Sequence, residues 1–178
     1  MSSSSSSTDP LFSATLLPPT VQRDLPPGYT IRPLCAADFS EGFLDVLRVL
    51  TTVGDISEQQ FADRYAYMKK HNDAYFLVVV EDSARPQGMR CVGTGCLVVE
   101  RKFIHELGLV GHIEDIAVAK DQQGKKLGLR LIQALDGVAE AVGCYKTILD
   151  CSDANEGFYV KCGYKRAGLE MAHYYKKD

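Results

Sequence analysis

Residues 111–128, GHIEDIAVAKDQQGKKLG, constrain the fold of this chain more than any other stretch. Residues 112–118 favour a β-strand, whereas the glycines and lysines of residues 123–128 favour a tight turn that enters a helix. The start of a helix has unsatisfied N–H groups and a partial positive charge, so it binds phosphate well. The stretch therefore predicts a strand, a basic turn and a helix that together hold a pyrophosphate. An ordinary turn at the start of a helix would have the same pattern.

Two adjacent carboxylates, Glu114 and Asp115, lie within the predicted strand. Neighbouring residues of a strand point to opposite faces of the sheet. We therefore expect one carboxylate to face a ligand and the other to support the structure.

The composition describes one domain with a substantial core. The chain has 178 residues, of which 46% are hydrophobic. A net charge of −3 and a pI near 5.8 argue against a nucleic-acid or anionic-membrane partner. No run approaches the roughly 20 apolar residues of a membrane span, and the first basic residue is Arg23, which argues against a secretory signal. A cytoplasmic protein is the expectation.

The cysteines contain no CxxC pair and lie in apolar or strand-like runs. They predict reduced thiols that fill the core of an intracellular protein, and neither a disulfide framework nor a zinc site, so no metal is expected. The six are Cys35, Cys91, Cys96, Cys144, Cys151 and Cys162.

The first half of the chain predicts a tail, a strand and two helices. Residues 1–27 are rich in serine and proline and indicate a disordered tail, followed by one folded domain at 28–178. Residues 29–33 end at a proline, which favours an edge strand. Asp38 is the expected N-cap of a first helix, and Ser57 with Gln60 forms the capping box of a second. Apolar residues recur at helical spacing in the first helix: Phe39, Phe43, Val46, Leu47 and Leu50.

The second half predicts a hairpin and then alternating strands and helices. Residues 75–80 and 91–99 are β-rich and joined by a polar turn. The helix after the basic turn should end at Gly143, since apolar residues recur at helical spacing up to that glycine. A strand at 146–151, a helix at 153–162 and a last strand at 164–175 follow. This order predicts an α/β chain with a mixed, α+β type of sheet.

The basic turn resembles the acyl-CoA loop of the GCN5-related N-acetyltransferase (GNAT) superfamily. That loop reads Gln or Arg, two residues, Gly, one residue, then Gly or Ala. The sequence here is Gln123-Gly124-Lys125-Lys126-Leu127-Gly128, so Lys126 stands at the first expected glycine. A side chain is tolerated at this position if the backbone there is already helical.

Four further segments are similar, in order and spacing, to the eukaryotic glucosamine-6-phosphate N-acetyltransferases of that superfamily: RKFIHELG, GHIEDIAV, GCYKTILDC and NEGFYVKCGY. The similarity covers residues 29–175. It implies a GNAT fold with splayed central strands that hold acetyl-CoA, and a homodimer in which the C-terminal strand reaches the second subunit. The implied reaction acetylates the amine of glucosamine 6-phosphate on the route to UDP-N-acetylglucosamine.

The resemblance assigns the catalytic roles to three side chains. Glu114 and Asp150 would hold and deprotonate the sugar amine, and Tyr159 would donate a hydrogen bond to the departing sulfur. A backbone N–H near Ile116 would polarise the carbonyl. Direct transfer is expected because no cysteine lies in a Cys/His arrangement that would activate it. Without the resemblance, Asp150 would be a cap at a strand end and Tyr159 a core aromatic residue.

The resemblance also implies two sets of binding residues. The cofactor set is Ile116, Ala117, Val118, Gly124, Lys125, Lys126, Leu127, Gly128, Leu129, Tyr159 and Lys161. The sugar set is Thr51, Lys102, Phe103, Ile104, His105, Glu114, Asp115, Asp150 and Tyr174. His105 could instead cap a loop, and Lys102 could be a plain surface lysine. Some relatives carry a phosphate-binding arginine in the last strand, where this chain offers only Tyr174, Lys176 or Lys177.

Two other functions fit parts of this pattern. A protein or polyamine acetyltransferase would share the acyl-CoA loop without needing Thr51 and residues 102–105. A non-catalytic acyl-CoA-binding module would need Gly124 and Gly128, but not Glu114, Asp150 and Tyr159 together.

Overall fold

The computed structural model describes residues 8–175, and its centre is a five-stranded mixed sheet in the order β1-β2-β3-β4-β5. The first four strands pair antiparallel, and β5 runs parallel to β4. The strands are β1 Tyr29–Pro33, β2 Tyr75–Asp82, β3 Cys91–Arg101, β4 Leu109–Val118 and β5 Cys144–Ile148. The serine run at 1–7, Lys176 and Lys177 lie outside the described residues.

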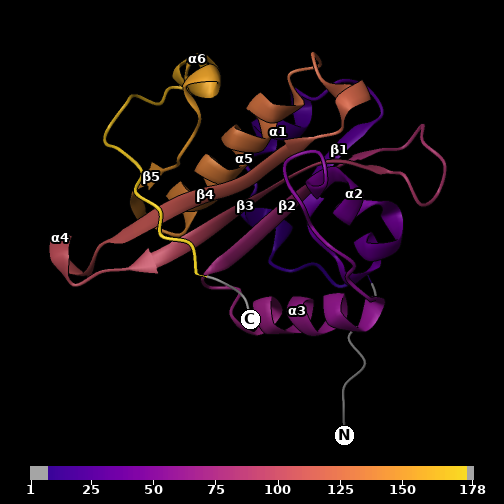
Figure 1. Ribbon diagram of the computed structural model, residues 1–178, viewed down its shortest axis with the longest axis horizontal. Coiled ribbons are helices and arrows are strands. Elements are labelled where there is room, and N and C mark those ends of the chain that lie inside the picture. The colour runs from indigo at the N-terminus through magenta and orange to yellow at the C-terminus, as the bar shows by residue number, and fades with distance from the viewer. Residues whose placement is uncertain (1–7, 176–178) are drawn as a thin grey trace, which may run out of the picture.

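Helices cover both faces of this sheet (Figure 1). The long helix α5 packs on β3, β4 and β5, and α2 and α3 lie on the other side (Figure 1). The α-helices are α1 Pro19–Arg23, α2 Phe43–Leu47, α3 Glu58–Lys70, α4 Ile104–Leu107, α5 Leu127–Ala141 and α6 Asp153–Lys161. The 3₁₀ helices are η1 Ala14–Leu16, η2 Ala36–Glu41 and η3 Lys120–Gln122.

The mixed α/β architecture and most local elements confirm the predictions. In the capping box of α3, the Gln60 N–H donates to Ser57 Oγ at 3.2 Å, and the Ser57 N–H donates to Gln60 Oε1 at 2.8 Å. The predicted hairpin is formed by β2 and β3, and the predicted edge strand is β1. The apolar stripe of α5 is buried, as Leu131 and Leu135 show with no exposed surface.

The prediction of a disordered tail is wrong for residues 8–27. Leu11 is fully buried and Phe12 is 3% exposed, with its ring packed edge-on against Phe76 at a centroid distance of 5.3 Å. The Tyr65 hydroxyl donates to the Asp9 carbonyl at 2.5 Å. The prolines did not prevent order, because Pro19 takes the first position of α1, where its missing N–H costs nothing.

The predicted helix from Asp38 to Leu50 is broken in two. Gly42 takes a left-handed conformation with a φ of 88° and separates η2 from α2. Asp38 is not the N-cap but lies within η2, where it is 1% exposed and accepts two hydrogen bonds from Arg32, at 2.7 and 2.9 Å. The ion pair therefore ties η2 to β1 through the buried carboxylate of Asp38.

The C-terminal region differs most from expectation. The strand predicted at 146–151 is β5, which begins and ends earlier, while α6 lies where the sequence places it. Residues 164–175 form no strand in the described chain. Met171 and Tyr174 are 91% and 90% exposed there. A strand requires a hydrogen-bonded neighbour, and the β-rich composition of a segment does not supply one.

The cysteines are free thiols, but they are not all core residues. Cys91 and Cys96 are buried, as predicted. Cys151 is exposed because the chain has already left β5 where it occurs.

Candidate active site

The strands β4 and β5 separate halfway along β4. The two strands pair as far as His112 and Ile148, whereas β4 continues to pair with β3 up to Val118. The second half of β4 therefore keeps one edge free of strand pairing with β5. Its backbone N–H and C=O groups on that edge are available to an extended ligand.

A β-bulge lies in this free half of β4. Thr94 pairs with Ala117 and Cys96 with Glu114, so Gly95 alone faces the two residues Asp115 and Ile116. Asp115 has a φ of 54°, in the left-handed region. The alternation of side chains is interrupted there, and both Glu114 and Asp115 are exposed. Strict alternation therefore does not apply to this pair, and the assignment of one carboxylate to a ligand and the other to support stays a prediction.

Gly95 leaves room for the bulge, a role that was not predicted from the sequence. A Cβ at this position would lie 2.5 Å from Ile116 Cδ1 and 3.0 Å from Leu135 Cδ1. The Ile116 side chain therefore occupies the space that a side chain at position 95 would need. An isolated glycine inside a strand pattern is the signal that could have indicated this site.

Glu114 lies in an environment that favours its neutral form. Partial withdrawal from water raises the pKa of the Glu114 carboxyl, and the negative charges of Asp115 and Asp150 raise it further. Burial raises the pKa of the neighbouring Cys96 thiol to about 12, so it remains neutral. Glu114 is therefore better suited to accept a proton than an ordinary surface carboxylate.

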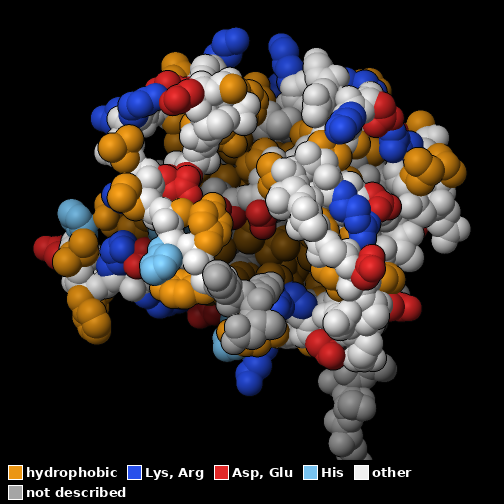
Figure 2. Space-filling view, in the orientation of Figure 1, with side chains coloured by type: hydrophobic (Ala, Val, Ile, Leu, Met, Phe, Trp, Pro, Cys, Tyr) orange, Lys and Arg blue, Asp and Glu red, His pale blue; other side chains and the backbone are white. Residues whose placement is uncertain are grey.

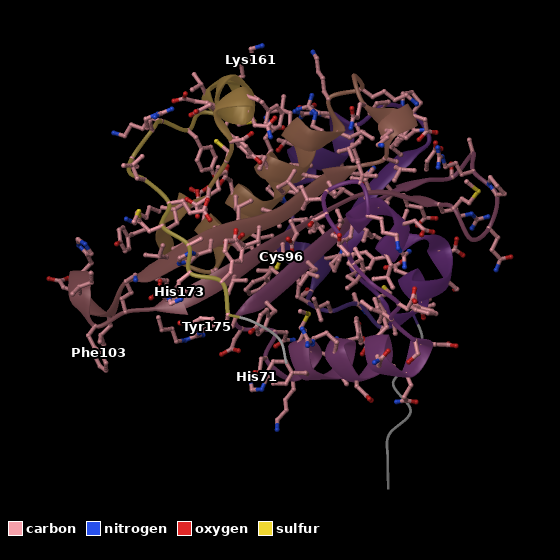
Figure 3. The ribbon with its side chains drawn as sticks, in the orientation of Figure 1. His71, Cys96, Phe103, Lys161, His173 and Tyr175 are labelled. Atoms are coloured by element: carbon pink, nitrogen blue, oxygen red, sulfur yellow. The ribbon has the colours of Figure 1, made fainter. Side chains whose placement is uncertain are left out.

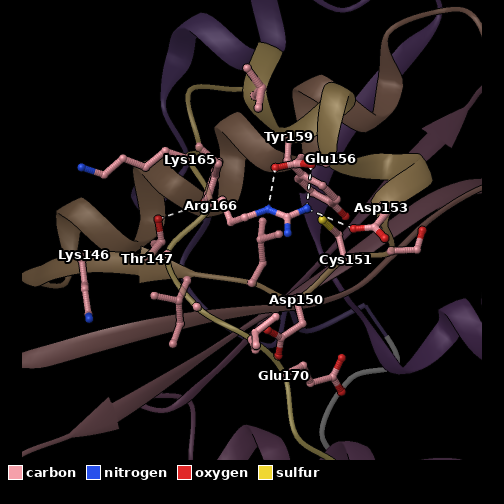
Figure 4. A pocket seen from close by; sticks show the side chains of 18 residues that line it. Lys146, Thr147, Asp150, Cys151, Asp153, Glu156, Tyr159, Lys165, Arg166 and Glu170 are labelled. Atoms are coloured by element: carbon pink, nitrogen blue, oxygen red, sulfur yellow. Dashed lines mark hydrogen bonds and ion pairs between the residues drawn. The ribbon is translucent and has the colours of Figure 1, made fainter.

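A cavity of about 420 Å³ lies between the end of β5, α6 and residues 164–170 (Figure 4). Asp150 and Tyr159 both line it, so the structure brings together two of the predicted catalytic residues. Arg166 forms ion pairs with Asp153 and Glu156 across one side, at 3.0 and 2.9 Å. Figure 2 shows this face hollowed near its centre, with acidic side chains in the hollow and apolar side chains at its base.

Tyr159 is a half-buried member of an aromatic cluster. Its ring packs edge-on against Phe158 and Tyr164, at centroid distances of 5.0 and 6.3 Å. Burial raises the pKa of the Tyr159 phenol above its ordinary value. The hydroxyl therefore remains protonated at neutral pH and can donate a hydrogen bond.

The basic turn joins η3 to α5 through left-handed backbone. Gly124 and Lys126 have φ values of 83° and 62°. The backbone at Lys126 does not have the right-handed helical conformation that would tolerate a side chain; it keeps the left-handed conformation that a glycine would favour. Lys126 is the N-cap of α5 and makes no side-chain capping hydrogen bond, so the first N–H groups of α5 have no side-chain acceptor from that position. The turn therefore fits an anionic ligand such as a pyrophosphate.

The three lysines predicted to bind the cofactor differ in their contacts and in where their side chains lie. The Lys125 ammonium donates to the Tyr29 hydroxyl at 2.6 Å and to Gln122 Oε1 at 2.7 Å. Lys126 is exposed at the turn. Lys161 points outward from α6, away from the sheet (Figure 3). Leu127 is buried, and a Cβ at Gly128 would lie 3.3 Å from the Phe158 ring, so α6 closely approaches the first turn of α5.

Several residues predicted to bind the sugar lie outside the cavity that contains Asp150. Residues 102–105 lie at the turn between β3 and β4, the end of β4 farthest from the basic turn (Figure 1). Lys102 pairs with Glu100 at 2.7 Å, and the His105 ring lies 4.7 Å from the Tyr145 ring. Phe103, with Ile104 beside it, is 94% exposed. Thr51 is exposed between α2 and α3, and neither it nor residues 102–105 line the cavity that contains Asp150.

Two further properties concern the described chain as a whole. Over residues 8–175, no helix has the length and apolar character needed to cross a bilayer. The same residues contain no group of three or more His, Cys, Asp or Glu side chains that could hold a metal ion. The expectation that no metal takes part stays a prediction.

A mixed sheet whose strands separate beside a basic turn at the start of a helix is the architecture of a GNAT-type acetyltransferase. Residues 41–164 match the family model described as Acetyltransferase (GNAT) family, and the chain belongs to this family. A relative from Candida albicans, the glucosamine 6-phosphate N-acetyltransferase, is 50% identical over 147 residues, which are 83% of this chain and 96% of the relative. The glucosamine 6-phosphate N-acetyltransferase 1 of Dictyostelium discoideum is 44% identical, over 83% of this chain and 91% of the relative.

A solved structure agrees with this assignment. The crystal structure of glucosamine-6-phosphate N-acetyltransferase from Arabidopsis thaliana superposes with a TM-score of 0.80 at 33% identity. It covers 83% of this chain and 99% of the crystallised chain.

Proposed function

We propose that this protein transfers the acetyl group of acetyl-CoA to the amine of D-glucosamine 6-phosphate, giving N-acetyl-D-glucosamine 6-phosphate and CoA. Members of the GNAT family use acetyl-CoA, and the relatives described above support the sugar phosphate as acceptor. The observation that carries the reaction class is the free edge of β4 beside Glu114, because it offers backbone donors next to a carboxylate with a raised pKa.

Acetyl-CoA would bind along β4 and reach the start of α5. The free edge at Ile116, Ala117 and Val118 can pair with the pantetheine as an added strand would. The pyrophosphate would meet the turn at Gly124 and Lys126. The N–H groups of the first turn of α5, which receive no capping bond from the Lys126 side chain, would complete this phosphate site; its residues are Leu127, Gly128 and Leu129.

Asp150 and Tyr159, which line the cavity, and Glu114 on β4 can together perform a direct transfer. Glu114 and Asp150 would hold the sugar amine and accept its proton as the nitrogen attacks the thioester carbon. The Ile116 N–H would stabilise the charge that develops on the carbonyl oxygen. As the carbon–sulfur bond breaks, the Tyr159 hydroxyl would donate to the sulfur, and no protein-bound acetyl group is formed.

A homodimer would complete the sugar end of the site. Apolar side chains that a single chain leaves exposed support this part of the proposal: Phe103, Ile104, Leu107, Leu169, Met171 and Tyr174. A second copy that covers them would bring its residues 102–105 or its Tyr174 near the cavity of the first. Sedimentation should then give twice the chain mass of 19.6 kDa. The acidic pI and reduced cysteines support a cytoplasmic enzyme that supplies UDP-N-acetylglucosamine synthesis.

Thiol release from acetyl-CoA tests the proposed function. We expect rapid release with glucosamine 6-phosphate, and a kcat/KM at least about 100-fold lower with plain glucosamine, because a charge-assisted phosphate contact would be lost. Spermidine and a lysine-containing peptide serve as alternative acceptors. Release that is faster with either of these, or that needs no acceptor, would overturn the assignment.

A further inference from the structure

A hydrogen-bonded cluster of three side chains lies behind the basic turn. The Tyr29 hydroxyl donates to Gln122 Oε1 at 2.6 Å, and the Lys125 ammonium donates to both of these oxygens, at 2.6 and 2.7 Å. The ammonium also lies 5.2 Å from the centroid of the Tyr29 ring. Gln122 is only 6% exposed. We call these residues the Tyr29–Gln122–Lys125 cluster.

Two anchored segments carry Tyr29 and Gln122. Tyr29 begins β1, where the Gln22 side chain accepts from the Ile31 N–H at 3.0 Å and donates to the Tyr29 carbonyl at 3.1 Å. Gln122 ends η3, whose preceding residue Ala119 donates through its N–H to the Val92 carbonyl at 2.8 Å. Both partners of Lys125 are therefore fixed to the sheet.

The turn itself has few bonds of its own. Gly124 and Lys126 both have positive φ, a conformation that an unsupported lysine rarely adopts. The side chain of Gln123 reaches the Val118 carbonyl only at 3.4 Å. Lys125 lies between these two left-handed residues and connects the turn to the anchored pair.

We propose that Tyr29 and Gln122 are positioning residues for acetyl-CoA, which act by holding the Lys125 ammonium behind the turn. Lys125 then sets the direction of the N–H groups at residues 124–128, and Lys126 is the lysine whose side chain meets the pyrophosphate. This inference rests on the proposed function, because it requires that the turn binds the phosphates of CoA.

The affinity of the full-length chain for CoA, measured by calorimetry without sugar, tests the inference. Tyr29→Phe should raise the Kd for CoA roughly three- to tenfold, in the range expected for one lost hydrogen bond to a charged group. Lys125→Met should raise it at least as much. The double variant should bind about as weakly as Lys125→Met alone, since both changes disable the same contact. Tyr67→Phe, a change to an exposed tyrosine of α3, should leave the Kd unchanged.

A second pair of variants separates the two lysines. Lys126→Met should combine multiplicatively with Tyr29→Phe, because the Lys126 side chain and the N–H groups positioned through Tyr29 and Lys125 would contact the phosphate separately. In the acetyl-transfer assay, Tyr29→Phe should raise the KM for acetyl-CoA by the same factor as the Kd and leave kcat within twofold. Gln122→Glu, which keeps an acceptor for both partners, should bind CoA within threefold of the unmodified chain, and Gln122→Leu should not.

Two outcomes would each overturn a different part of these conclusions. Multiplicative losses for Tyr29→Phe and Lys125→Met, in a chain that binds CoA, would show that Tyr29 does not act through Lys125 and would overturn the positioning role alone. Failure of the unmodified chain to bind CoA would overturn the proposed function and this inference together.

Discussion

Replacing Gly95 with alanine tests whether the bulge of β4 shapes the active site. The added Cβ would overlap Ile116 Cδ1, at 2.5 Å, and would crowd Leu135 Cδ1, at 3.0 Å. Forcing an extra methyl group into a packed core typically costs about 1–3 kcal/mol. For a chain of this size, each kcal/mol lowers the Tm by about 2–4 °C, so we expect a decrease of roughly 2–12 °C.

Gly93 provides the matched control, since it lies two residues earlier on the same strand. A Cβ there would lie 3.4 Å from Leu131 Cδ1 and from Val80, which is ordinary contact. Gly93→Ala should therefore leave stability unchanged or raise it by up to about 1 kcal/mol through the lower entropy of the unfolded chain. Thermal unfolding followed by circular dichroism compares the two variants directly.

The same substitution should also reduce activity. Displacing Ile116 moves the backbone N–H proposed to stabilise the carbonyl oxygen, so kcat/KM should fall at least about tenfold, which corresponds to about 1.4 kcal/mol. Adding Ile116→Val removes the overlapping methyl group and should recover most of the lost stability. If Gly95→Ala is as stable as Gly93→Ala, or if Ile116→Val recovers nothing, the role assigned to the bulge is wrong.

Three further substitutions test the chemistry and the fold. Tyr159→Phe should lower kcat roughly ten- to a thousandfold and leave the Kd for CoA unchanged; unchanged turnover would remove Tyr159 from the mechanism. The negative charge of Glu170 helps to raise the pKa of Glu114, which must be ionised to accept a proton. Glu170→Gln should therefore lower that pKa and move the acid limb of the kcat/KM profile to lower pH. A move to higher pH would contradict this. Phe12→Ala should lower the free energy of unfolding in urea by about 3–5 kcal/mol. The control Thr15→Ala, at an exposed residue, should lower it by about 0.5 kcal/mol or less. A loss below about 1 kcal/mol for Phe12→Ala would contradict the burial of the N-terminal segment.

Local sequence patterns were sufficient to predict most of the helices and strands. The capping box of Ser57 and Gln60, the hairpin of β2 and β3 and the apolar stripe of α5 depend on residues only a few positions apart. The same holds for the strand, basic turn and helix of residues 109–141. Asp150 and Tyr159 could be anticipated as neighbours because a strand end and the helix that follows it cannot be far apart.

The features that shape the site depend on partners distant in the chain. The bulge at Asp115 exists because Gly95, on another strand, leaves room for Ile116, and the direction of Lys125 is decided by Tyr29, 96 residues away. The burial of Phe12 likewise needs Phe76. Backbone propensities and periodicity carry no information about such contacts, because each contact forms only when the folded sheet brings the two segments together.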